Sequence, residues 1–365
     1  MSKTPKRIFI AATRQNDGKT TLSLGLMALL KKHFGNIGFI KPIGQRYLVE
    51  QGYNIDEDSF LIEEIFGIPC NLKDMSPVAI ERGFTKKYIQ NPGNKALKKQ
   101  VLDAFKMVSK GNDIVVIEGT GHAGVGSVFD MSNAVVAKML DAKVIIVSAG
   151  GIGRPIDEVM LSIPLFEKVG VEIAGVIINK VQAGKYRKID ELVRKGFEYH
   201  GLKVLGVIPY IKMLDMPTMA HMNSEFKGKF ISGKNADLYK PIHNIIIGTA
   251  KPSTVLREMK DNNVVIASGD RDDLIKYLLN VVKKKSEDFL RGLVITCGLM
   301  PSRAIRSLLE KSNIPALVVE ENTYQVITAL DKAIVKIQPE EKDKINTVER
   351  LVANHLDIDG ILKSI

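Results

Sequence analysis

Short apolar segments alternate, over the first 210 residues, with longer segments whose apolar residues recur at helical spacing. The apolar segments are RIFIAA, IGFIKPI, DIVVIEGT, KVIIVSA, AGVIINKV and KVLGVIP. The helical segments between them include residues 19–34, 94–110, 131–140, 156–169 and 186–200. Strands that are apolar on both faces and separated by amphipathic helices are typical of a parallel sheet covered by helices on both sides. We therefore predict an α/β fold of three layers with a mostly parallel central sheet.

The alternation stops between Pro209 and Pro241, where the chain becomes rich in methionine and glycine. We expect an irregular stretch here and a domain boundary near Met213. A second alternation follows, with the strands HNIIIGTA, VVIASG, LVITCG and ALVVEE and helices over 253–261, 272–285, 302–311, 323–332 and about 340–355. The predicted organisation is a first domain over 1–212, a second and smaller α/β domain over 213–338, and a C-terminal helical segment over 339–365.

The formal net charge of +11 does not by itself indicate nucleic-acid binding. The lysines are scattered over the polar faces of predicted helices and have no interleaved aromatic residues, so we expect solvated surfaces and no nucleic-acid partner. A positive field also favours a small ligand that carries phosphate.

Apolar runs of the ~18 residues that a membrane span needs are absent from the sequence, and the N-terminal segment offers no small-residue cleavage site. We expect a cytoplasmic protein without a membrane partner. Cys70 and Cys297 lie far apart and form no CxxC pair, so neither a disulfide framework nor a zinc site is expected. Both cysteines are predicted to be buried as small apolar residues.

The segment AATRQNDGKTT, residues 11–21, lies between the first strand and the first helix and has the features of a phosphate-binding loop. Successive backbone N–H groups and the helix dipole surround phosphates in such a loop. Gly18 lets the backbone approach the ligand, Lys19 supplies charge to the outer phosphates, and the Thr20 hydroxyl ligates Mg²⁺. Ala12 stands where the opening glycine is expected, which is tolerable if its φ is negative. The alternative, a chance GKTT at a helix N-terminus, is disfavoured by the strand-loop-helix context.

Charged side chains follow two other strands of the predicted sheet. Lys41 in KPIGQ ends the second strand, where it can neutralise phosphate or orient an anionic substrate. Asp56 and Asp58 precede an amphipathic helix, and each is either an N-terminal cap or a magnesium ligand. Glu118 ends the third strand, in a position from which a carboxylate holds Mg²⁺ directly or through water.

Four glycines, at positions 119, 121, 124 and 126, follow Glu118 and suggest a binding loop with room for a ligand against the backbone. His122 in this loop is either a base, a phosphate contact or an ordinary loop residue. Asn179 ends the fifth strand and can present an acceptor and donors to an adenine edge, although it can also be a turn residue. The residues expected around the nucleotide are Thr13, Asp17, Gly18, Lys19, Thr20, Thr21, Gly119, Gly121 and Asn179.

These segments resemble the dethiobiotin synthetase-like P-loop family, and most closely the N-terminal region of long bacterial phosphotransacetylases. The resemblance covers about residues 7–210 and is carried by AATRQNDGKTT, KPIGQ, EDSFLIEEIFG, EGTGHAGVGS and GVIINKV. It implies ATP and Mg²⁺ as cofactors, and a homodimer or higher homo-oligomer. The roles that it implies are phosphate and magnesium binding for Lys19 and Thr20, phosphoryl and substrate contacts for Lys41, metal binding for Asp58 and Glu118, and adenine binding for Asn179. Lys19 and Lys41 are the residues expected to be catalytic.

The second domain resembles the DRTGG domain that follows the same region in long phosphotransacetylases. The matching segments are Gly269-Asp270-Arg271 and Thr296-Cys297-Gly298, with Cys297 where that motif has glycine. Both segments end predicted strands, where Asp270, Arg271, Thr296 and Ser302 can hold a polar ligand, or where Asp270 and Arg271 simply form an ion pair. The acetyl-transferring domain of phosphotransacetylases would follow Ile365, so we expect no such activity from this chain.

Two hypotheses about function follow. The first is a Mg·ATP-binding regulatory ATPase linked to metabolism, in which the nucleotide site is coupled to an unidentified small molecule in the second domain. The second is an ATP-dependent ligase that phosphorylates a carboxylate or carbamate, motivated by the glycines after Glu118. A third, a scaffold whose ATP site has decayed, rests only on Ala12.

Overall fold

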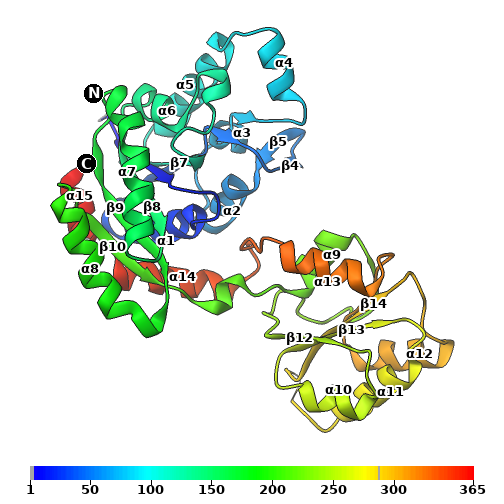
Figure 1. Cartoon of the computed structure of the whole chain (residues 1–365). Coiled ribbons are helices and arrows are strands. Elements are labelled where there is room, and N and C mark those ends of the chain that lie inside the picture. The colour runs from blue at the N-terminus through cyan, green and yellow to red at the C-terminus, as the bar shows by residue number, and fades with distance from the viewer. Residues whose placement is uncertain (1–3, 287) are drawn as a thin grey trace. The chain divides into compact units, whose positions relative to one another are not determined.

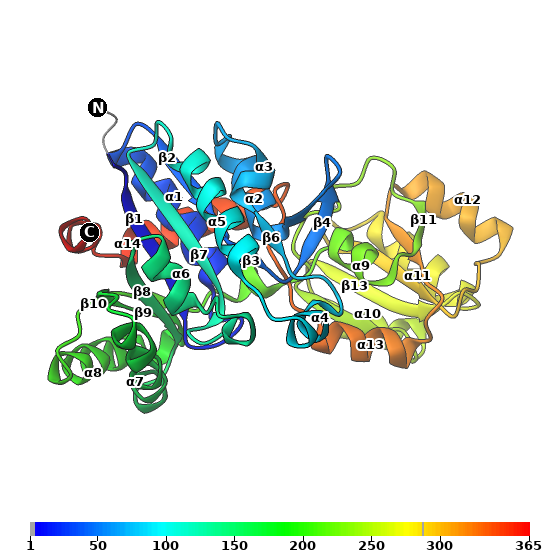
Figure 2. The same cartoon turned by 90° about the horizontal axis from the view of Figure 1, so that it is seen from above.

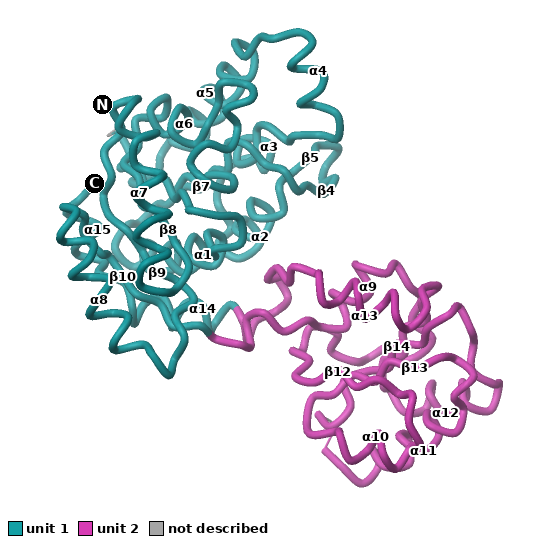
Figure 3. The backbone as a smooth tube through the Cα atoms, viewed as in Figure 1, with its two compact units in different colours: residues 1–210, 345–365 teal, residues 211–344 magenta. Residues whose placement is uncertain are grey.

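The computed structural model describes residues 4–286 and 288–365, which form two compact units (Figure 1). Unit 1 consists of Met1–Tyr210 and Ile345–Ile365, and unit 2 of Ile211–Lys344. The last residues therefore belong with the first unit, although the sequence suggested a separate segment over 339–365 (Figure 3). Within the described ranges, the helices are all too short or too polar to cross a membrane.

A six-stranded parallel sheet forms the centre of unit 1, in the order β10-β9-β8-β1-β7-β2. Its strands are β1 (Lys6–Ala12), β2 (Ile37–Ile40), β7 (Ile114–His122), β8 (Lys143–Ala149), β9 (Ile173–Val181) and β10 (Val204–Pro209). Residues from the middle of β1, β7 and β8 are fully buried, as expected for strands covered on both faces. The predicted α/β fold class and all the predicted strands of this unit are confirmed.

Helices cover both faces of this sheet (Figure 2). They are α1 (Lys19–His33), α5 (Lys95–Ser109), α6 (Asn133–Met139), α7 (Gly153–Lys168), α8 (Tyr186–Tyr199), α14 (Lys342–His355) and α15 (Ile358–Ser364). Because βαβ crossovers are right-handed, the strand order puts α1 on one face and α5 to α8 on the other. Helix α14 packs on α1, where a β-carbon at Gly25 would collide with Val352.

Between β2 and β7 the chain builds small elements beside the edge of the sheet. Strands β3 (Ile43–Gly44) and β6 (Val78–Ala79) pair in parallel, and β4 (Tyr47–Glu50) and β5 (Tyr53–Asp56) form an antiparallel hairpin. Three helices follow the hairpin, namely α2 (Glu57–Phe66), α3 (Leu72–Met75) and α4 (Phe84–Gln90). Single 3₁₀ turns occur at Ser127–Phe129, Ala183–Lys185 and Lys212–Asp215.

Unit 2 contains a five-stranded sheet in the order β11-β15-β14-β13-β12, in which only β11 is antiparallel to its neighbour. Its strands are β11 (Lys229–Ser232), β12 (Asn244–Ile247), β13 (Asn263–Ser268), β14 (Leu290–Thr296) and β15 (Ala316–Val318). Its helices are α9 (Met219–Phe226), α10 (Pro252–Glu258), α11 (Asp272–Val282), α12 (Arg303–Ser312) and α13 (Thr323–Lys332).

Alternate residues of β13 enter two separate cores, as the pleat of a strand requires. Val265 packs with residues of α10, α11 and α12, whereas Val264 and Ile266 pack with residues of α9 and α13. The predicted second, smaller α/β unit is therefore a sheet with helices on both faces.

Two expectations about local structure are wrong. The methionine-rich stretch after Pro209 is not irregular, because it contains helix α9 and strand β11. Met219, Met222 and Phe226 lie on one buried face of α9, and the Thr218 side chain caps the helix at His221 N. Neither cysteine is buried: Cys70 is half-buried, and Cys297 is exposed at a positive φ of 70°.

The contact between α1 and α14 generates the first prediction. Replacing Gly25 by alanine puts a methyl group where Val352 lies, so Gly25→Ala should lower the free energy of unfolding by about 1–3 kcal/mol, although alanine favours helix. Val352→Ala in the same chain should relieve the collision. Urea denaturation of both single variants and the double variant measures the coupling. Strictly additive effects would show that the two helices do not touch here.

Candidate nucleotide site

The phosphate loop starts where β1 ends. Ala12 is the last residue of β1 and is not among the described residues with positive φ, so alanine meets the condition under which it can replace glycine. Gly18 has a φ of 93° and directly precedes α1. A β-carbon at Gly18 would collide with Asn179 Nδ2, so both its backbone conformation and its surroundings require glycine.

Asp17 organises the loop from inside. Its Oδ2 accepts hydrogen bonds from Thr13 Oγ1 at 2.8 Å and from the Arg14 backbone N–H at 2.7 Å. Its backbone oxygen accepts one from Asn179 Nδ2 at 2.9 Å. Burial raises the pKa of Asp17, and these hydrogen bonds only partly offset that rise. The structure thus places Thr13 and Asp17 in the loop as partners of each other, and Thr21 in the first turn of α1.

Lys19 and Thr20 join the loop to the end of β7. Lys19 Nζ donates a hydrogen bond to the Gly121 backbone oxygen at 3.1 Å, and Thr20 Oγ1 donates one to Glu118 Oε1 at 3.2 Å. Lys19 is buried, and burial lowers its pKa despite the attraction of Glu118. A buried ammonium group would form a stronger hydrogen bond if a phosphate oxygen replaced the carbonyl oxygen as its acceptor.

Lys41 lies within a group of three carboxylates. Its Nζ is 3.0 Å from Asp56 Oδ1 and 3.5 Å from Glu118 Oε1, and it forms a short ion pair with Asp58. Burial alone would lower the pKa of Lys41, but these carboxylates outweigh it and hold the pKa well above its usual value. Asp56 also caps α2 by accepting from Asp58 N at 2.9 Å. Asp56 is therefore the cap of α2, and magnesium binding by Asp56 or Asp58 stays a prediction.

The residues at this edge fit a magnesium ion that binds together with phosphate. Among the described residues, no group of three or more histidine, cysteine, aspartate or glutamate side chains could hold a metal ion by itself. Mg²⁺, however, usually binds through one or two carboxylates, water and substrate phosphates. Glu118 Oε2 is buried and accepts no hydrogen bond from the described residues, and the Thr20 hydroxyl contacts the same carboxylate. Burial raises the pKa of Glu118, although the nearby charges of Lys41 and Lys19 oppose that rise.

The glycines after Glu118 serve the packing of the protein itself. A β-carbon at Gly119 would lie 2.7 Å from the Phe9 ring and 2.8 Å from Asn133 Oδ1, and one at Gly126 would collide with the Met131 backbone oxygen. His122 is exposed, and its Nδ1 accepts from Gly124 N at 3.2 Å. The room that the sequence suggested beside these glycines is therefore mostly filled, and ligand contacts of Gly119 and Gly121 stay predictions.

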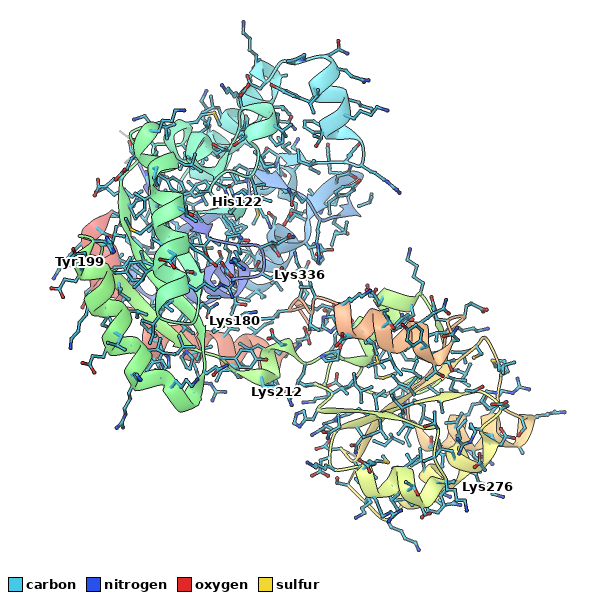
Figure 4. The ribbon with its side chains drawn as sticks, viewed as in Figure 1. His122, Lys180, Tyr199, Lys212, Lys276 and Lys336 are labelled. Carbon is cyan, nitrogen blue, oxygen red and sulfur yellow. The ribbon has the colours of Figure 1, made fainter. Side chains whose placement is uncertain are left out.

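Asn179 supports the loop, and its neighbour Lys180 lies across it. Besides its bond to Asp17, the Asn179 side chain accepts from Lys180 N at 2.9 Å, so contact with adenine stays a prediction. Lys180 has a φ of 57°, and its Cε is 3.9 Å from where a Gly18 β-carbon would be. The Lys180 side chain is labelled in Figure 4. Lys180 was not among the residues expected at the site, although its position near the end of β9 could have indicated it.

The four residues expected to bind a ligand in unit 2 have different surroundings. The Arg271 guanidinium donates to the backbone oxygens of Gly248 and Ala250 and to the Asp273 carboxylate, so protein groups occupy it. Ser302 caps α12 through Ile305 N. Thr296 is buried against Thr323 with 2.9 Å between their hydroxyl oxygens, whereas Asp270 is exposed. Their joint role in binding a ligand stays a prediction.

Similarity to known proteins agrees with this geometry. Residues 6–218 match the AAA domain family AAA_26, and residues 222–333 match the DRTGG domain. A phosphate acetyltransferase of Nitratidesulfovibrio vulgaris is 27% identical over 360 residues, which cover 96% of this chain and 50% of that protein. This chain spans about half the length of the phosphate acetyltransferases that it matches. An ATP-dependent dethiobiotin synthetase of Nitrosopumilus maritimus is 28% identical over 234 residues, which cover 64% of this chain and 97% of that protein.

Among solved structures, the MinD cell division protein of Aquifex aeolicus covers 57% of this chain and 84% of its own, with 17% identity and a TM-score of 0.34. This TM-score is low, so the fold of unit 1 is assigned from its own strand order. The match to AAA_26 covers more than half of the sequence, and the phosphate loop lies within it. The chain therefore belongs to the AAA_26 family of P-loop nucleotide-binding domains, and a DRTGG domain follows in the same chain.

Proposed function

We propose that this chain is a Mg·ATP-binding regulatory module in which nucleotide binding in unit 1 is coupled to a small ligand in unit 2. The observation that carries the proposal is the arrangement around the phosphate loop. Lys19, Thr20, Lys41 and Glu118 come from three separate segments and meet at one edge of the sheet. Ligands of open parallel sheets bind at that edge.

The groups of the site suit a triphosphate with its magnesium ion. Lys19 would transfer its hydrogen bond from Gly121 to a phosphate oxygen, which the backbone N–H groups of the loop would also bind. Thr20 and Glu118 would hold the ion, which neutralises phosphate charge when bound. Lys41 keeps its positive charge at neutral pH because carboxylates surround it, and it would offset part of their negative charge beside the phosphates.

Regulation is favoured over synthesis by two features. The β-carbon positions of Gly119, Gly121 and Gly126 meet protein atoms, so packing explains these glycines without a second substrate. Unit 2 matches a DRTGG domain and is joined to unit 1 by two connections in the chain, at residues 210–211 and 344–345. Unit 2 is restrained by two covalent connections and not by a single one. Such a restraint would allow ligand binding in one unit to affect the other.

An ATP-dependent ligase that phosphorylates a carboxylate or carbamate is the second candidate. It is supported by the similarity to dethiobiotin synthetases over nearly their whole length. Release of ADP separates the two. A regulatory ATPase should release ADP slowly from ATP alone, with no change when bicarbonate and a diamine are added. An acceleration that requires those additions would favour the ligase.

The nucleotide site itself is tested by thermal unfolding. Mg·ATP at about 100 times its Kd should stabilise the protein by about 2.7 kcal/mol, seen as a rise in melting temperature. Lys19→Ala should abolish the rise, because the buried ammonium group is the main charge in the loop. Lys106→Ala, which removes an exposed lysine of α5, is the matched control and should behave like the wild type. Equal rises in all three proteins would contradict the assignment.

The magnesium assignment predicts a dependence on pH. Burial raises the pKa of Glu118, so its carboxylate gains a proton at a higher pH than the ~4.3 of an exposed glutamate. The part of ATP affinity that requires Mg²⁺ should therefore decline as pH falls through this raised pKa. Titrations with and without Mg²⁺ over that range measure it. Glu118→Gln should lose the Mg²⁺-dependent part at every pH, and a Mg²⁺ effect that survives in this variant would remove Glu118 from the metal site.

A further inference from the structure

Two arginines beside the phosphate loop share one carboxylate. Arg14, within the loop, places Nη2 at 2.5 Å from Glu158 Oε1, and Arg154 places Nε at 2.7 Å from the same oxygen. The other oxygen, Oε2, lies 3.0 Å from Thr13 Oγ1, whose single hydroxyl proton is shared between Glu158 and Asp17. Glu158 lies in α7, far from the loop in sequence, so folding alone creates this group.

The charges in this group do not balance. A single carboxylate, that of Glu158, pairs with two guanidinium groups. Both arginine side chains are 55% exposed, whereas that of Glu158 is 12% exposed. An anion that arrives from solvent therefore meets the guanidinium groups first. Planar guanidinium groups also match the geometry of phosphate oxygens.

We propose that Arg14 and Arg154 form an anion subsite for the terminal phosphate of a bound nucleoside triphosphate, with Glu158 as the carboxylate that pairs with them when no phosphate is bound. The proposal rests on the ATP site described above. A second pair of cations beside the loop can recognise the added charge that ATP has and ADP lacks. The site would thus distinguish ATP from ADP, as a regulatory protein requires.

Glu158 has a competing role in this account. Although burial would raise its pKa, hydrogen bonds from Arg154 and Thr13 hold that pKa below its usual value, so Glu158 stays ionised and occupies both arginines when no phosphate is present. A terminal phosphate would have to displace it from part of its contacts. Removing the charge of Glu158 should therefore free the arginines for phosphate, not disable the subsite.

The alternative is that this group only ties the loop to α7. The two explanations predict different effects of Glu158→Gln on the affinity for ATP. If the contacts merely hold the loop in place, then Arg14→Gln, Arg154→Gln and Glu158→Gln break the same links and should weaken ATP and ADP alike. If the arginines bind phosphate, the two arginine variants should weaken ATP alone, and Glu158→Gln should not weaken it.

The experiment is calorimetric titration of the full chain with Mg·ATP and with Mg·ADP. We expect each arginine variant to raise the Kd for ATP about tenfold and the Kd for ADP less than about twofold. Glu158→Gln should keep the Kd for ATP at or below that of the wild type. Arg194→Gln is the matched control, because Arg194 pairs with Asp190 at the same spacing and is 47% exposed.

Two outcomes would overturn the proposal. Equal losses for ATP and ADP in the arginine variants would show a role in loop structure, and unchanged affinities would show no role at all. Both can occur while the wild type still binds ATP, so failure of this subsite is distinct from failure of the nucleotide site. If the wild type itself does not bind ATP, both the anion subsite and the nucleotide site are rejected.

Discussion

The arrangement of the site depends on one buried ammonium group. Lys41 Nζ lies among Asp56, Asp58 and Glu118, and it links the end of β2, the start of α2 and the end of β7. Buried carboxylates are costly unless a cation compensates for their lost hydration, and loss of one partner leaves the others unpaired. The group is therefore stable only as a whole. It keeps three acidic side chains next to a phosphate loop, where they would otherwise repel each other and the ligand.

The phosphate loop is likewise held by contacts from several separate segments. Asp17 binds the loop from within, Asn179 holds its backbone from β9, and Glu158 reaches it from α7. Gly18 lies directly against Asn179, since a β-carbon there would collide with Asn179 Nδ2. The missing opening glycine matters little in this setting. Ala12 is simply the last buried residue of β1, and the turn that requires a positive φ falls later, at Asn16 and Gly18.

Local sequence was sufficient for the features that depend on periodicity. The apolar strands, the loop before Lys19 and the place of Lys41 directly after β2 all follow from patterns within a few residues. Glu118 lies within β7, which continues to His122, but parallel strands still bring it to the same side of the sheet. Helix α9 was within reach too, since Met219, Met222 and Phe226 have helical spacing, but its many methionines and nearby glycines suggested an irregular stretch. The return of the last helices to unit 1 was not predictable, because an amphipathic face does not say which core it covers.

Residues that act through distant partners were the least predictable. Arg154 forms a local i,i+4 pair with Glu158 in α7, but only folding brings the same carboxylate to Arg14. Arg271 had the opposite outcome: its motif suggested a ligand, but two backbone oxygens and Asp273 occupy its guanidinium group. In each case the deciding information is which acceptor lies opposite the side chain. Hydrogen-bond partners far apart in sequence leave no local pattern.

The central claim is that the loop, Lys41 and Glu118 together form a magnesium-dependent ATP site. A crystal structure of the full chain with Mg²⁺ and a non-hydrolysable ATP analogue tests it most directly. The account predicts phosphate oxygens against the loop backbone and Lys19 Nζ, and the ion between the phosphates, Thr20 and Glu118. An analogue bound elsewhere, or a phosphate loop that stays empty at a saturating concentration of the analogue, would contradict it.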